Sequence, residues 1–215
     1  MILSVAFDMV GSEHPARSIA AGALAGAAAW ILGYLITYAG AITDIRADEQ
    51  AETLGLAVEG SIEFELVGLL FYNAHYVDAE VPQYSVLQAL EPNHNFVLAD
   101  GGSTLLLFLV PIVVLLLAGG IVASYASENL EPSTTAALTG GTVVVGYFPL
   151  VVLGLFVFTI DPGDGAMRPA PVFAVAIAGL LYPLVFGAIG GVLAGGATRV
   201  SGGFGTDLED GEAGQ

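Results

Sequence analysis

Residues 101–127 read GGSTLLLFLVPIVVLLLAGGIVASYAS and contain no Asp, Glu, Lys, Arg or His. An α-helix rises ~1.5 Å per residue, so about 20 apolar residues are enough to cross a hydrocarbon core of ~30 Å. The segment exceeds this length without interruption. It therefore predicts a membrane-spanning helix.

Three further stretches share this composition, namely residues 18–43, 132–160 and 169–198. Each of them is also long enough to span a bilayer. Only residues 128–131 separate the second stretch from the third, so these two helices are expected to form an antiparallel hairpin. The sequence predicts an all-α membrane protein with four transmembrane helices.

The one long polar segment, residues 44–100, carries 11 acidic residues and a single Arg, which predicts an acidic extramembrane loop. Within it, LVGLLFYNAHYV at residues 66–77 is apolar but too short to cross a membrane. We expect a short helix near residues 64–77 that is interfacial, re-entrant or packed on the mouth of the bundle. A fifth span is the alternative, and it would bury Glu63, Glu65 or Asp78 at roughly 2.5 to 3.5 kcal/mol each.

Shorter signals complete the organisation of the chain. Residues 1–17 form an N-terminal segment that leads into the first span, and residues 161–165, DPGDG, indicate a turn between the last two spans. Alternating residues predict a small hairpin built from 76–81 and 95–99. The Gly-rich and acidic residues 199–215 have little to bury, so we expect a disordered tail.

Charge is the second strong signal, because 21 acidic residues face four Arg and no Lys, for a formal net charge of −17. Such a surface disfavours nucleic acid as a partner. Acid excess without Lys is typical of proteins that work in multimolar salt, where screening removes the self-repulsion. The composition therefore indicates a halophilic source. The chain has no Cys, which excludes disulfides and thiolate metal sites.

The positive-inside rule gives a tie, since four spans place Arg17 and Arg199 on one side and Arg46 and Arg168 on the other. Arg17 and Arg199 each adjoin a span, and the long acidic loop is more naturally exported. We therefore expect a multi-pass protein of the cell membrane with both termini inside.

Small residues recur at helical spacing in the first and fourth spans. Glycines four apart line one face of a helix and let backbones approach closely in a membrane. This pattern predicts packing within the bundle, with a homodimer seam as the alternative. The residues concerned are Gly22, Gly26, Gly187, Gly191 and Gly195.

Proline interrupts three spans, at Pro111, Pro149 and Pro183. Each removes a helical hydrogen bond, so we expect kinks there. No span contains an ionisable acid, base or histidine, which argues against proton-coupled transport. The polar side chains that remain in the spans are Thr37, Thr139, Thr142, Thr159, Ser124, Tyr34, Tyr38, Tyr125, Tyr147 and Tyr182.

The loop block Tyr72, Asn73, His75 and Asp78 contains the most chemistry in the chain. On a helix, His75 and Asp78 would share a face, and His94 could add a second imidazole for a zinc-like ion. The alternative is that Asn73 and His75 turn inward and bond to backbone groups, because buried polar side chains need partners. No catalytic or nucleotide-binding motif occurs, so neither an enzyme nor a cofactor is expected.

Three blocks resemble a family of uncharacterised multi-pass membrane proteins from haloarchaea: residues 33–38, GYLITY; residues 70–77, LFYNAHYV; and residues 182–187, YPLVFG. The resemblance covers about residues 16–198, and residues 1–13 precede it. The family implies a membrane location but supplies no activity.

The sequence predicts a non-enzymatic membrane protein that acts through its external loop, a membrane-protein partner or a second copy of itself. A passive channel or small-solute transporter is the alternative, and metal binding by the loop is a second one. A continuous polar route across the bundle would favour transport.

Overall fold

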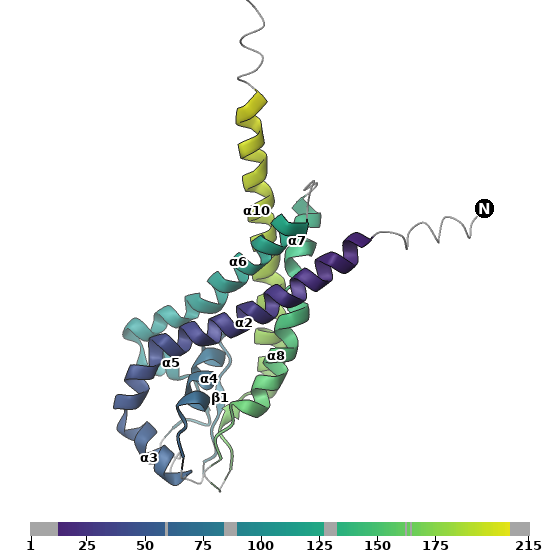
Figure 1. Cartoon of the computed structure of the whole chain (residues 1–215). Coiled ribbons are helices and arrows are strands. Elements are labelled where there is room, and N and C mark those ends of the chain that lie inside the picture. Colours follow the sequence, from purple (N-terminus) through teal and green to yellow (C-terminus); the bar gives the residue numbers. More distant parts are fainter. Residues whose placement is uncertain are drawn as a thin grey trace, which may run out of the picture.

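The structure is a computed structural model that describes residues 13–58, 60–83, 90–126, 133–161, 163 and 165–206 (Figure 1). Four helical segments in this part are long and apolar enough to cross a membrane, at residues 17–47, 102–125, 134–157 and 171–195. The predicted number of spans is therefore confirmed. The predicted hairpin turn at 128–131, residues 1–12 and the acidic end 207–215 lie outside the described residues.

The first span lies in one continuous helix, α2 (Glu13–Ala47), while each of the other three is broken or changes helix type. The second joins the 3-10 helix η1 (Gly102–Phe108) to α6 (Leu109–Ala126). The third is divided into α7 (Ser133–Gly141) and α8 (Val144–Val157). The fourth runs through α9 (Pro171–Phe173), the π-helix η2 (Ala174–Leu181) and α10 (Tyr182–Thr206).

The three prolines lie at different kinds of position. Pro111 is in the first turn of α6, directly after η1, and Pro183 is the second residue of α10, directly after η2. Pro149 is inside the α-helix α8. All three prolines lie within the candidate spans, as the sequence prediction places them.

The spans pack as two pairs that cross. α2 packs against α6 and α8, and α10 packs against α6 and α7. Figure 1 shows α2 and α6 running side by side along one diagonal, with α8 and α10 along another direction. On one side of the crossing the two pairs diverge, and α4 and β1 lie between them. We call this region the wedge.

Glycines form the crossing itself. A Cβ on Gly26 would overlap the Val143 carbonyl oxygen, and one on Gly146 would overlap that of Ala23. Gly22 lies against Thr142, at the break between α7 and α8. Gly187 packs on Gly119 and Gly140, and Gly191 on Ala136, while Gly195 is buried. Gly22, Gly26, Gly187 and Gly191 thus lie in close contact with other helices of the same chain.

The loops at the wedge end combine into one small module, built on a three-stranded sheet. Its order is β2 (Asn93–His94), β1 (Ala79–Glu80), β3 (Arg168–Pro169), all antiparallel. The expected hairpin is therefore only partly right. Residues 96–100 form a helix, α5 (Phe96–Asp100), because the side chain of Asn95 caps its N-terminus. The third strand comes from the loop between the last two spans.

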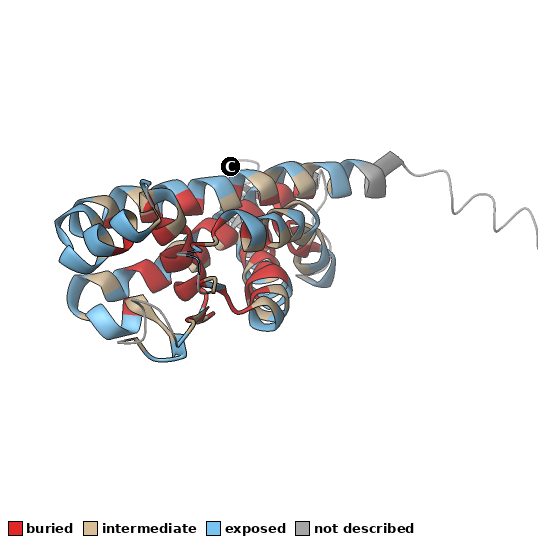
Figure 2. Cartoon of the chain, turned by 90° about the horizontal axis from the view of Figure 1, so that it is seen from below, coloured by how far each residue is buried: buried red, intermediate tan, exposed pale blue. Residues whose placement is uncertain are grey.

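The two helices inside the long loop have different surroundings. α3 (Glu49–Ala57) is capped by Asp48 and is mostly exposed, with Leu54 as its one buried residue. α4 (Glu63–Asn73) is buried on every side from Leu66 to Asn73 (Figure 2). A helix that is apolar all round belongs in a core. Of the three settings expected for this segment, the structure favours packing within the bundle over lying flat at an interface.

Two boundaries differ from the sequence prediction. The short helix ends at Asn73 rather than near residue 77. At the other end of the chain, α10 continues as helix to Thr206, eight residues beyond 198, where we expected a disordered tail to begin.

Candidate functional site

The chain leaves α4 through a tight turn that aims His75 into the bundle. The Val77 N–H donates to the Tyr72 carbonyl at 3.2 Å and the Tyr76 N–H to the Asn73 carbonyl at 2.9 Å, which is the hydrogen-bond pattern of a Schellman cap. This cap requires a left-handed residue, and Tyr76 supplies it with φ of 58°. Glycine usually takes this position, so Tyr76 stores some backbone strain.

His75 is 1% exposed and both of its ring nitrogens have partners. Nδ1 lies 2.7 Å from the Phe71 carbonyl oxygen, and Nε2 lies 2.7 Å from the Tyr147 hydroxyl of α8. Because a carbonyl oxygen only accepts, Nδ1 must carry the proton. The neutral ring then accepts the Tyr147 O–H at Nε2. His75 therefore links α4 to the third span as a neutral imidazole.

Burial also controls the acid–base behaviour of this site. Desolvation lowers the pKa of His75 from 6.5 to about 4, against a smaller opposing effect of its hydrogen bond to Phe71. Burial raises the pKa of the Tyr72 phenol as well. At neutral pH both side chains are uncharged, as their apolar surroundings require.

Asn73 is completely buried and joins three parts of the module. Its Nδ2 donates to the Val77 carbonyl at 2.8 Å, and its Oδ1 accepts the Phe96 N–H at 2.9 Å.

The neighbouring Tyr72 hydroxyl donates to the Val151 carbonyl of α8. Asp78 accepts from the Asn95 side chain at 3.2 Å. Asn73 and His75 thus lie inward and bond to backbone groups, as one of the two sequence hypotheses described.

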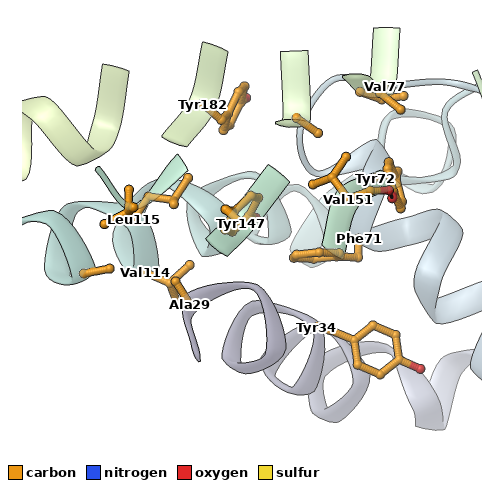
Figure 3. Packing of buried hydrophobic residues seen from close by; sticks show 14 of the residues in the cluster. Ala29, Tyr34, Phe71, Tyr72, Val77, Val114, Leu115, Tyr147, Val151 and Tyr182 are labelled. Atoms are coloured by element: carbon orange, nitrogen blue, oxygen red, sulfur yellow. Dashed lines mark hydrogen bonds between the residues drawn. The ribbon is translucent and has the colours of Figure 1, made fainter. Parts of the chain in front are cut away.

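Aromatic rings enclose this polar group. His75 lies 4.8 Å from the Phe71 ring in an edge-on geometry and 5.0 Å from the Tyr182 ring, measured between centroids. Figure 3 shows Phe71 and Tyr72 of α4, Tyr147 of α8 and Tyr182 of α10 among the side chains of one buried cluster. Tyr182 follows directly on the π-helix η2, and such irregular turns are frequent near functional sites.

The metal candidates do not converge. His75 and Asp78 share no helical face, because α4 ends at Asn73 and a left-handed residue separates them. His94 packs on the Phe96 ring at 4.6 Å, in β2 of the sheet. Among the described residues, no three His, Asp or Glu side chains gather in a way that could hold a metal ion.

The hydroxyls of the spans are mostly engaged close to their own helix. Thr37 donates to the Gly33 carbonyl at 2.9 Å, and Thr159 to the Leu155 carbonyl at 3.0 Å. Thr142 reaches the Thr139 carbonyl at 2.6 Å and the Ser18 carbonyl at 3.3 Å. The hydroxyls of Tyr34 and Tyr147 differ from them, because their partners, the Phe64 carbonyl and His75, belong to the long loop.

Sequence reasoning identified the loop side of this site but missed the partners in the bundle. Tyr147 and Phe158 are two of the aromatic residues in apolar segments, and their spacing does not indicate a contact with α4. Gly68 gives a hint in retrospect, since a Cβ there would overlap the Phe158 ring. A glycine inside a short, otherwise bulky apolar helix indicates a close approach.

Four helices in the described part of the chain are long and apolar enough to cross a membrane, which suggests a multi-pass membrane protein. A family model of unknown function, DUF7978, matches residues 9–198, and the chain belongs to this family. The match includes α4 and the whole module, so the buried site lies inside the family's shared region. No curated protein and no solved structure matches the chain.

Proposed function

We propose that this protein is a non-enzymatic membrane protein, in which the bundle anchors an acidic module that acts as an interaction or structural platform. The observation that carries the proposal is the burial of α4 in the wedge. Residues 66–73 fill the space between the diverging helix pairs with their own side chains. An interior filled in this way supports a rigid anchor rather than a conduit.

The polar side chains support the same reading. A route for solutes would be lined by Thr37, Thr142, Tyr147 and Tyr182, and the first three are engaged in hydrogen bonds inside the protein. Transport would require α4 to leave the wedge, which would break the bonds of His75 and Tyr72 together. We therefore favour the function of an interaction or structural platform over that of a transporter.

The surface of the module is acidic, and both of its arginines are paired. Arg46 lies 3.4 Å from Glu63 and Arg168 lies 3.1 Å from Glu80. A partner protein would therefore meet negative charge and need a basic surface. Exposed apolar side chains such as Leu56 on α3, 75% exposed, would supply the contact area.

An orientation with both termini inside and the module outside is supported by the positions of two arginines. Arg17 and Arg199 each lie next to the end of a span, and the long acidic loop would more naturally be exported. The chain contains no cysteine, so Ser61→Cys and Ser201→Cys each introduce a single thiol. An impermeant maleimide on intact cells should label Ser61→Cys only. Labelling of both variants would contradict this topology.

Flux into reconstituted vesicles tests the platform against transport. Light scattering after an osmotic step should show water and glycerol entry no faster than in protein-free vesicles. A Tyr147→Phe variant serves as the control, because it alters the only bond between a span hydroxyl and His75 described above. Solute entry that exceeds protein-free vesicles and changes in Tyr147→Phe would overturn the proposal.

A second experiment tests whether the module binds a partner protein. It places a photo-crosslinking amino acid at Leu56 of the module or at Leu153 on the lipid side of α8, and both side chains are more than half exposed. A single discrete crosslinked protein at Leu56, absent at Leu153, supports a platform. Crosslinks to a second copy would identify a homo-oligomer, and lipid adducts alone at both sites would count against a protein partner.

A further inference from the structure

An open groove of about 630 Å³ lies on the outside of the bundle between α6 and α10. The two helices touch at the crossing, where a Cβ on Gly190 would overlap the Leu116 carbonyl, and they stay packed one turn further on, where a Cβ on Gly120 would lie 3.3 Å from the Gly190 carbonyl oxygen. The floor of the groove contains Gly120, Gly190 and Ala194. Its walls are almost entirely apolar.

The groove has the depth of one membrane leaflet. Its α6 wall extends from Leu116 to Tyr125, the last residue of the second candidate span. Nine residues of helix cover ~14 Å, about half of a hydrocarbon core of ~30 Å. The α10 wall ends at Ala194, next to the end of the fourth span. The groove thus opens at the membrane boundary and closes near mid-membrane.

The rim excludes a closely packed partner helix. Helices associate in membranes through small residues that let backbones approach. Here Leu117, Ile121 and Leu193 project from both walls, each about 60% exposed at 59%, 64% and 62%. These side chains would hold a second helix away from the glycine floor. A flexible hydrocarbon chain is narrow enough to lie between them.

The open end is the polar end. Ser124 and Tyr125 place two hydroxyl-bearing side chains where both spans finish, and Tyr125 is 75% exposed. Tyrosines are enriched at this level of the bilayer, beside the headgroups. Hydroxyls there can donate to the ester or phosphate oxygens of a lipid.

We propose that the α6–α10 groove binds one membrane phospholipid, with a hydrocarbon chain along Gly120 and Ala194 and its headgroup beside Ser124 and Tyr125. The lipid comes from the leaflet on the side opposite the module. It fills a space that the helices leave at their crossing, and its binding is independent of the platform role.

The test measures phospholipid bound to the full chain after detergent washing, by native mass spectrometry with dioleoylphosphatidylglycerol added back. Ala194→Phe and Ser124→Phe fill the groove from its two walls. Ala28→Phe is the matched control, because Ala28 is exposed on α2 in the first span, away from the groove. We expect one tightly held lipid in the wild type and Ala28→Phe, and ~10-fold weaker binding in both groove variants, a change of about 1.4 kcal/mol.

Equal lipid binding in all four proteins would overturn the proposal, as would an equal loss in Ala28→Phe, which would indicate general membrane lipid only. A change from dimer to monomer in the groove variants would show a protein interface instead. Should Ala194→Phe fail to fold, by circular dichroism, Ser124→Phe still decides the question, because it alters an exposed position.

Discussion

At the helix crossing, glycines bring backbones into direct contact, whereas in the wedge the contacts are made by large side chains that carry polar atoms. Gly26 and Gly146 leave no room for even one added carbon. His75 and Asn73 are equally buried, yet they are positioned by hydrogen bonds to four other residues. The crossing therefore depends mainly on shape, with a hydrogen bond from Thr142 to the Ser18 carbonyl beside Gly22, whereas the wedge depends on shape together with several hydrogen bonds.

Among the substitutions considered, one at the helix crossing should lower the free energy of unfolding the most. Gly26→Ala drives a Cβ into the Val143 carbonyl, and backbone cannot move aside cheaply, so we expect a loss of about 3 kcal/mol in the free energy of unfolding. Gly40→Ala is the control on the same helix, since its Cβ would sit 3.5 Å from a Leu107 methyl. Chemical denaturation in detergent measures both. A Gly26→Ala variant as stable as Gly40→Ala would contradict the close contact.

The wedge should respond to loss of a hydrogen bond. His75→Ala leaves the buried Tyr147 hydroxyl and Phe71 carbonyl without this partner, which should cost about 2 kcal/mol. His94→Ala, at a site that makes only a described ring contact with Phe96, should cost less than ~1 kcal/mol. Thermal unfolding compares the two. Zinc bound to the wild type and lost from His75→Ala would instead support the metal hypothesis.

Acid should weaken the wedge but leave the crossing unaffected. The pKa of His75 is lowered from 6.5 to about 4, so between these values the unfolded chain binds a proton that the folded chain does not. Stability therefore falls as pH drops below 6.5, by roughly 1.4 kcal/mol at pH 5.5. His75→Gln removes this contribution. Subtracting its pH profile from that of the wild type isolates the effect from the titrating carboxylates, and a zero difference would refute it.

Substitutions in the turn after α4 should change the stability least. Tyr76→Ala keeps the strained backbone and loses the stacking of Tyr76 on Phe108, whose ring centroids lie 4.3 Å apart. Tyr76→Gly loses the same stacking but relieves the strain. We expect the glycine variant to be the more stable of the two by about 1 kcal/mol. Equal melting temperatures would show that the left-handed position carries no strain.

Composition was enough to predict the spans, because apolar length is a property of each segment by itself. The same is true of α4, whose 66–77 stretch could neither cross the membrane nor remain in water. The break between α7 and α8 was missed, although it follows directly on Gly140 and Gly141 and a Gly-Gly pair is a turn signal. It occurs at Thr142, where Gly22 of α2 packs against the chain.

The features that the sequence did not predict are those that depend on pairing between distant segments. His75 and Tyr147 are 72 residues apart, and β3 is a two-residue strand that alternation cannot reveal. The sequence showed that His75 and Asn73 needed partners. It could not show that one partner would be a phenol in the third span.

The pairing of β1 with β3 bears on how the protein is made. Arg168, the partner of Glu80, lies 88 residues later in the chain. At a synthesis rate of about 5 to 20 residues per second, β1 leaves the ribosome roughly 4 to 18 seconds before β3 does, and α4 leaves before β1. Until the third span and the loop after it are made, the apolar surface of α4 has no Phe158 or Met167 to cover it. A chain stalled before the third span would therefore display this helix to the translocation machinery and to quality-control proteases.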